Sequence, residues 1–156
     1  MSMLIKNKEL VEDTWVTLDA EAPLPDNPNQ AVIVPLRRWQ AERDALSARP
    51  GEVGVQLEPT DDVWAAADDL TAAPLVALSF PKFADGRGYS QAYILRTHLG
   101  FKGELRAVGD VLRDQIHHMA RCGIDAFAIR EGKDPRDALK AFEVFSVAYQ
   151  DTHPRV

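Results

Sequence analysis

The chain has 156 residues, of which 46% are hydrophobic and 27% are charged, and its formal net charge is −6. This balance is typical of a single globular domain and excludes the collagen-like, disulfide-rich and disordered classes. The acidic charge argues against a general nucleic-acid binder, which needs a basic face. No apolar run approaches the roughly 20 residues of a membrane-spanning helix, so we expect no membrane association.

The first thirty residues differ from the rest. Met3–Val11 and Thr14–Leu18 are strand-like runs around Glu12-Asp13 and predict a hairpin. The segment that follows is rich in proline, asparagine and aspartate, which predicts a loop. We therefore expect three parts: an N-terminal hairpin and proline-rich loop over residues 1–30, a single α/β domain over 31–150, and a loose tail over 151–156.

From residue 31 onwards predicted strands and helices alternate. The strands are short apolar runs at Ala31–Val34, Val53–Leu57, Leu75–Phe80, Leu105–Val108, Ala126–Ile129 and Val144–Tyr149. The helices are Leu36–Ala48, Thr60–Leu70 capped by Thr60, a helix from near Gly86 to Leu99, Val111–Cys122 and Pro135–Phe142. This alternation predicts an α/β fold of repeated β-α units with a mainly parallel sheet. Six units are too few for a complete eight-unit barrel, so an open wound sheet and a partial TIM-like barrel are both open.

Cys122 is the single cysteine, so no disulfide can form within the chain. The lack of an internal disulfide fits the reducing cytoplasm, where we expect the protein to reside. Cys122 is predicted at the carboxyl end of a helix, where the helix dipole raises the thiol pKa and disfavours a reactive thiolate. We therefore expect a structural role for it.

The richest candidate site is the loop after the most apolar strand. Ligands of parallel α/β folds bind outside the carboxyl ends of the strands, and this loop leads from such an end into a helix. Glycines free backbone N–H groups, and a helix N-terminus offers such donors to an anion. The candidate anion-binding residues are Lys82, Gly86, Arg87, Gly88 and Ser90. The alternative is an Asp-Gly turn whose arginine pairs with a nearby acid.

Arg106 and Gln115 are further candidates for binding an anion or ligand. We expect the turns after Phe80 and Val108 to open on one rim, where Arg87 and Arg106 form a positively charged recess. Arg106 lies inside a short strand of a sheet covered on both faces, so its charge needs a partner or an opening. Gln115 falls within the apolar face of its helix, where its amide would bind a backbone group or a ligand. The candidate catalytic residues are Lys82, Asp85 and Asp110, of which Asp110 has helix capping as its alternative role.

The segment from Lys82 to Arg130 is basic within an acidic chain, with eight Lys or Arg against five Asp or Glu residues. This excess suits a small anion, although arginines on helix surfaces would give the same count. The sequence contains no P-loop, dinucleotide fingerprint, Cys-x-x-Cys pair or histidines at metal spacing. We therefore predict no cofactor and no metal site.

Four segments are distinctive: Phe80–Ala92, Gly103–Gln115, Arg121–Phe127 and Phe145–Gln150. On these segments the chain, from about Ala31 to Gln150, resembles the bacterial domain-of-unknown-function family 934. Members of that family are commonly labelled as oxidoreductases of sulfite reduction. The resemblance implies a setting in sulfur assimilation and carries over no catalytic residues.

Three functions are consistent with the residues and the resemblance. The first is a non-redox accessory of assimilatory sulfite or sulfate reduction that binds a small anion or contacts sulfite reductase or another sulfur-assimilation enzyme. The second is a small enzyme acting on an anionic substrate at the strand ends. The third is a structural interaction module, such as a homodimer that completes a barrel. Whether the chain is an enzyme stays open. The resemblance carries an oxidoreductase label, but the sequence contains no redox-cofactor motif.

Overall fold

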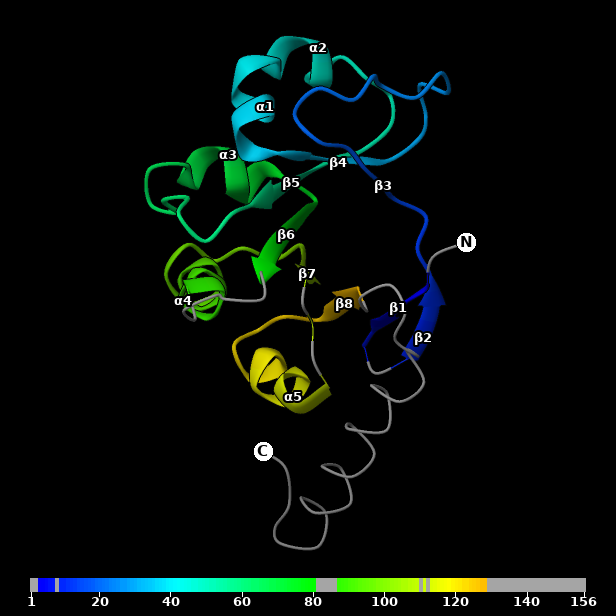
Figure 1. The fold of residues 1–156 in the computed structure, drawn as a ribbon. Coiled ribbons are helices and arrows are strands. Elements are labelled where there is room, and N and C mark those ends of the chain that lie inside the picture. Colours follow the sequence, from blue (N-terminus) through cyan, green and yellow to red (C-terminus); the bar gives the residue numbers. More distant parts are fainter. Residues whose placement is uncertain (1–2, 8, 81–86, 110, 112, 129–156) are drawn as a thin grey trace, which may run out of the picture.

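The structure is a computed structural model that describes residues 3–7, 9–80, 87–109, 111 and 113–128 (Figure 1). The helix predicted at Pro135–Phe142, the strand predicted at Val144–Tyr149 and the tail lie outside these residues. In the part of the chain that is described, no helix is long and apolar enough to cross a membrane.

The described strands form one sheet. They are β1 (Met3–Lys6), β2 (Glu9–Glu12), β3 (Val16–Thr17), β4 (Val32–Pro35), β5 (Val53–Leu57), β6 (Leu75–Phe80), β7 (Glu104–Gly109) and β8 (Ala126–Ala128). Their order is β2-β1-β8-β7-β6-β5-β4-β3. From β3 to β8 each strand is parallel to its neighbours, and β1 and β2 add an antiparallel edge next to β8. The prediction of a mainly parallel α/β sheet with an N-terminal hairpin is confirmed.

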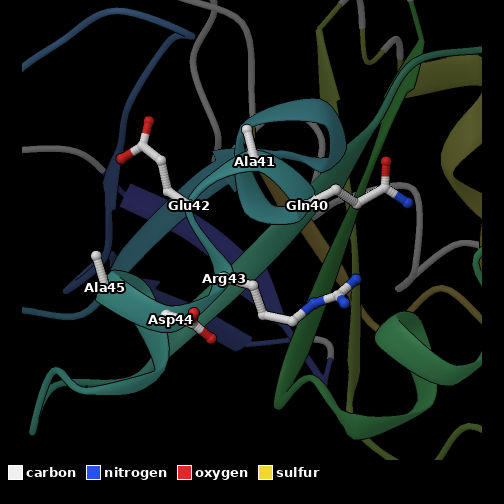
Figure 2. A pocket seen from close by; sticks show the side chains of 6 residues that line it. All are labelled: Gln40, Ala41, Glu42, Arg43, Asp44 and Ala45. Atoms are coloured by element: carbon white, nitrogen blue, oxygen red, sulfur yellow. The ribbon is translucent and has the colours of Figure 1, made fainter.

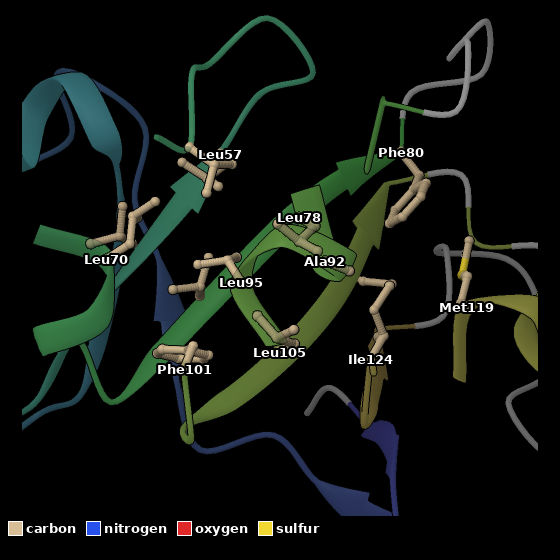
Figure 3. Packing of buried hydrophobic residues seen from close by; sticks show 14 of the residues in the cluster. Leu57, Leu70, Leu78, Phe80, Ala92, Leu95, Phe101, Leu105, Met119 and Ile124 are labelled. Atoms are coloured by element: carbon tan, nitrogen blue, oxygen red, sulfur yellow. The ribbon is translucent and has the colours of Figure 1, made fainter. Parts of the chain in front are cut away.

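The helices cover one face of this sheet. They are α1 (Leu36–Ala41), α2 (Arg43–Ser47), α3 (Ala67–Ala72), α4 (Arg87–Tyr93), its π-helical continuation η1 (Ile94–His98) and α5 (Arg113–Arg121). Leu70, Leu95 and Met119 from these helices share one core with Leu78 and Leu105 of the strands (Figure 3). The parallel strands stand in chain order without the reversal that marks a doubly wound sheet, which favours a partial barrel.

The short segment from Asp13 to Trp15 shows how strongly the sheet curls. It joins β2 to β3, the two strands at opposite ends of the strand order. Laid flat, eight strands about 4.8 Å apart would place these edges about 34 Å apart. The four residue steps from Glu12 to Val16 span at most about 14 Å. The sheet is therefore curled into a partial barrel whose edges approach each other.

This segment lies over the concave face, the one opposite the helices. Trp15 packs against the cluster formed by Ile33, Leu75 and Ala77, whose side chains belong to that face. Asp13 accepts a hydrogen bond from Arg106, which stands beside Ala77 in the register. The N-terminal residues therefore cover the inside of the partial barrel, and β1 extends the same sheet through its pairing with β8.

The N-terminal hairpin turns at a different point from the one predicted. β1 pairs with β2 around Asn7, which has a φ of 53°. Asparagine is one of the few residues besides glycine that tolerate this left-handed conformation, which fits a turn at Asn7. The second predicted strand contributes only β3, which pairs with β4 instead.

Two predicted helices also differ from the structure. The helix after β4 is interrupted at Glu42 (φ −117°, ψ 28°), although the Glu42 N–H still binds the Arg38 carbonyl. The helix predicted from Thr60 begins only at Ala67. Asp62, rather than Thr60, accepts backbone N–H groups at the start of the preceding turns, because its carboxylate reaches the residues two and three positions later.

Candidate functional site

The carboxyl ends of β6 and β7 meet at Phe80 and Gly109. These two residues stand opposite each other in the parallel register and are the last residues of their strands. Gly109 has a φ of 95°, and a Cβ there would lie 2.8 Å from the Phe80 carbonyl oxygen. Only glycine fits this close approach. The two turns that the sequence singled out therefore begin side by side at one edge of the sheet.

Gly88 brings α4 close to this edge. It is buried, and a Cβ on it would lie 2.6 Å from the Phe80 ring. The next residue, Tyr89, packs edge-on against Phe80 with ring centres 5.2 Å apart and contacts the His118 ring of α5 at 4.5 Å. The first turn of α4 is thus held against the end of β6 by a close-packed aromatic contact.

Gln91 connects α4 to the loop after β5. Its amide nitrogen donates to the carbonyls of Glu58 (2.9 Å) and Asp61 (3.1 Å), and its side chain is 4% exposed. Its amide oxygen has no hydrogen-bond partner among the residues described. Gln91 is not among the site residues predicted from the sequence. The signal was its place among buried positions three, four and seven apart, together with Gly88, Ala92 and Leu95.

The predicted anion-binding loop is described only at its end. Arg87 begins α4 and is exposed, and Ser90 is exposed on the same helix. The other predicted residues of this loop and of the turn after β7 lie outside the described residues: Lys82, Asp85, Gly86 and Asp110.

Arg106 does not reach this edge, so the prediction that Arg87 and Arg106 share one positively charged recess is wrong. It lies on the concave face of the sheet, whereas α4 with Arg87 packs on the other face. The Arg106 side chain is 3% exposed and donates to Glu104 (Nε to Oε2, 2.9 Å) and to Asp13 (Nη1 to Oδ1, 3.0 Å). Of the two readings that the sequence left open, the structure supports an acidic partner, because both carboxylates are within hydrogen-bond distance.

Lys6 extends this set of charges. Its ammonium lies 2.8 Å from the other Glu104 carboxylate oxygen, and this hydrogen bond raises the pKa of Lys6. Lys6, Glu104, Arg106 and Asp13 thus form an alternating chain of charges that links β1, β7 and the segment over the concave face. Its role is to hold these elements together.

Gln115 is exposed on α5, so the prediction that its amide faces the sheet is wrong. Ile116 and Met119 are the buried residues of this helix. The predicted apolar face is too wide, because the predicted helix includes Val111 and Cys122. Both lie outside α5, and without them Gln115 falls beyond the buried arc.

Two surface hollows contain none of the predicted site residues. One, of 510 Å³, lies where α1 meets α2 (Figure 2). Of its charged residues Glu42, Arg43 and Asp44, Glu42 pairs with Arg38 and Arg43 pairs with Asp69. Figure 2 shows Glu42 pointing to one side and Arg43 to the other. The second, of 330 Å³, opens at the amino ends of β6 and β7 beside Lys6 and Glu104.

Burial raises the pKa of the Cys122 thiol. The direction agrees with the sequence prediction, but the cause is burial rather than the helix dipole. Burial also raises the pKa of the nearby Tyr89 phenol, so both groups are protonated at neutral pH. Among the described side chains, no three His, Cys, Asp or Glu residues are grouped so that they could hold a metal ion.

The model of a family described as a bacterial protein of unknown function (DUF934) matches residues 54–155, about two thirds of the chain. No curated protein matches the chain. The matched range includes Phe80, Gly88, Gln91 and Gly109, so the whole described edge falls within it. It excludes the N-terminal strands and their covering of the concave face. The chain therefore belongs to the DUF934 family of bacterial proteins of unknown function.

Proposed function

We propose that this protein is a non-redox accessory of assimilatory sulfite or sulfate reduction that binds a small oxyanion at the carboxyl ends of β6 and β7. The observation that carries the proposal is the opposition of Phe80 and Gly109. Because Phe80 and Gly109 are neighbours, the two segments that follow them and contain the candidate residues begin at adjacent positions. This edge of the sheet is where parallel α/β folds bind their ligands. The metabolic setting rests on the family resemblance.

The chemistry of this edge suits an anion. Arg87 supplies a permanent positive charge, and Lys82 adds a second one in the segment that leads into α4. The first backbone N–H groups of a helix have no intrahelical partner and therefore donate outward. Gly88 allows this turn to lie against Phe80, next to the strand ends. Ser90 and Gly86 complete the set of proposed donors.

Calorimetry on the full chain with sulfite, sulfate and phosphate tests the binding site. We expect heat of binding with at least one of these anions, and Arg87→Ala to weaken it about tenfold, as the loss of one charge-assisted hydrogen bond would. Arg43→Ala is the matched control, because Arg43 is also an exposed arginine but lies on α2, outside the proposed site. The absence of heat with all three anions would contradict the anion site.

Growth of a deletion strain on single sulfur sources tests the metabolic setting. We expect poor growth on sulfate and sulfite and normal growth on sulfide, because an accessory of sulfite reduction acts before sulfide is formed. Wild-type chain should restore growth, and the Arg87→Ala chain should restore it only in part. Normal growth of the deletion strain on all three sources would contradict the role in sulfite or sulfate reduction. It would leave the result of the anion-binding experiment unchanged.

A further inference from the structure

Two exposed aromatic side chains meet at one histidine. Trp64 is 54% exposed and Tyr93 is 55% exposed, and their rings lie 5.5 Å and 5.7 Å from the ring of His98. Trp64 comes from the turns before α3, whereas Tyr93 and His98 come from α4 and η1. Trp64, Tyr93 and His98 therefore form one aromatic patch across two successive β-α units. Tryptophan and tyrosine are enriched in the buried centres of protein interfaces.

The backbone under Trp64 is held in place. The Asp62 carboxylate accepts the N–H groups of Trp64 (3.0 Å) and Ala65 (3.3 Å). Val63 and Ala66, on either side, are buried in the core. Gln91 ties the preceding loop to α4 through its hydrogen bonds to the Glu58 and Asp61 carbonyls. A surface fixed in this way loses little conformational entropy when a partner binds.

The other half of the patch contains a π-helical turn. In η1 the Leu99 N–H binds the Ile94 carbonyl, five residues earlier, at 2.9 Å. Such turns are rare and frequently occur at functional sites, because they shift the residues that follow out of the regular helical position. His98 is the last residue of this turn, and it is the residue that both aromatic rings contact.

The segment that carries Trp64 has charges of a single sign. Residues 58–69 hold five acids and no lysine or arginine: Glu58, Asp61, Asp62, Asp68 and Asp69. Asp62 and Asp68 are exposed. Among the described residues, Arg43 is the cation that pairs with this segment, through Asp69. The remaining carboxylates give the Trp64 side of the aromatic patch a negative potential, which a cationic partner would complement, whereas the helices on the Tyr93 side carry Arg87 and Arg96.

We propose that the aromatic patch and the exposed carboxylates of Asp62 and Asp68, which belong to the Trp64 segment, form a docking surface for an arginine-bearing segment of another protein. A guanidinium group lies flat over the Trp64 or Tyr93 ring, whose face attracts cations. Its N–H groups donate to one of the carboxylates of the Trp64 segment. Arginine combines both contacts, whereas lysine offers only a point charge. This surface uses none of the residues proposed to bind the anion.

Nuclear magnetic resonance of the indole N–H groups tests the docking surface on the full chain. The Trp64 signal is identified by its loss in Trp64→Phe. The probe is a blocked Gly-Arg-Gly-Arg-Gly peptide, compared with its lysine and glutamate counterparts. We expect a saturable shift of the Trp64 signal with the arginine peptide, a weaker one with lysine and none with glutamate. The shift should diminish with added salt, since exposed charges are screened.

The variant Asp62→Asn with Asp68→Asn tests the carboxylates, because asparagine still accepts the N–H groups that Asp62 holds. We expect this pair of changes to weaken arginine-peptide binding about fivefold, in line with exposed charge pairs. The control removes two other exposed acids, Glu9→Gln with Glu52→Gln, and should leave binding unchanged. The absence of a saturable shift, or an equal loss in the control, would overturn the proposal. A Trp64 signal that shifts with protein concentration alone would also overturn it, because a second copy would then be the occupant.

Discussion

Arg106 of β7 and Asp13, 93 residues earlier in the chain, form a buried ion pair of 3.0 Å on the concave face of the sheet. Asp13 belongs to the short segment that joins the two edge strands β2 and β3. The pair therefore fixes that segment across the open side of the partial barrel. Glu104 binds the same guanidinium and also Lys6, so the contact extends to β1.

Removing Asp13 should cost more stability than removing an exposed partner at a similar distance. Asp13→Ala leaves the buried Arg106 guanidinium with one of its two carboxylates, and we expect a loss of about 1–3 kcal/mol in the free energy of unfolding. The Arg43–Asp69 pair is as short, at 2.7 Å, but Arg43 is 51% exposed. Arg43→Ala should cost less than about 1 kcal/mol. Urea unfolding of both variants measures the difference, and equal losses would show that burial does not decide it.

Gly88→Ala should destabilise the protein although alanine favours helices. The new methyl group would lie 2.6 Å from the Phe80 ring, so α4 or the ring must move. We expect a loss of about 1–3 kcal/mol, as in other overpacked cores, instead of the gain of about 1 kcal/mol that helix propensity alone would give. Phe80→Leu combined with Gly88→Ala should recover part of the loss in a double-mutant cycle. Ser90→Ala, on the exposed side of the same helix, should stay within about 0.5 kcal/mol of wild type.

Arg96→Lys should be costly because the guanidinium serves three backbone carbonyls. Its Nε donates to Gly123 (2.9 Å), and its Nη1 donates to Phe101 (3.0 Å) and Gly103 (2.8 Å). An ammonium group cannot reproduce this planar set of donors. We expect a loss of about 2–3 kcal/mol, measured by thermal or urea unfolding. Arg121→Lys, at an exposed position, is the control and should change stability by less than about 0.5 kcal/mol. A similar effect at both sites would contradict the proposed role of Arg96.

The parallel strands β4 to β8 could be predicted from the sequence because each is a short apolar run bounded by polar turns. β5 and β6 match the prediction at both ends. The starts of helices were harder, since they depend on which side chain reaches a free N–H group. Asp62 accepts these N–H groups in place of Thr60, and the sequence does not show which of the neighbouring residues Thr60, Asp61 and Asp62 will do so. The order of the parallel strands also does not fix the curvature of the sheet, which follows from the short segment Asp13–Trp15 that joins the edge strands β2 and β3.

The candidate edge was predictable in part for a simple topological reason. Parallel strands that follow one another end at the same edge, so the turns after Phe80 and Val108 had to start near each other. The role of Arg106 was not predictable, because its partner Asp13 lies in the segment expected to be a hairpin turn. Gln115 was misplaced because the helix is shorter than its apolar pattern.

The Asp125 carboxyl group should make stability depend on pH in the acidic range. It accepts the Leu105 N–H at 2.9 Å and lies 3.5 Å from an Arg96 nitrogen, yet burial raises its pKa above the ordinary 3.8. A carboxyl group with a higher pKa in the folded state binds protons more readily there than in the unfolded chain. Its contribution to stability therefore falls as pH rises from 3.8 through the raised pKa, and is constant above it.

Asp125→Asn should remove this contribution, because asparagine keeps an acceptor for Leu105 and does not ionise. The stability of the variant relative to wild type should increase as pH rises through this range, measured by urea unfolding from about pH 3 to about pH 7.

Asp19→Asn gives the opposite sign. The N–H groups of Glu21 and Ala22 lower the pKa of Asp19, so its ionised form stabilises the fold above 3.8 and that contribution is lost as pH falls through the lowered pKa. Asp19→Asn should therefore lose stability relative to wild type as pH rises, and the same slope in both variants would contradict burial as the cause at Asp125.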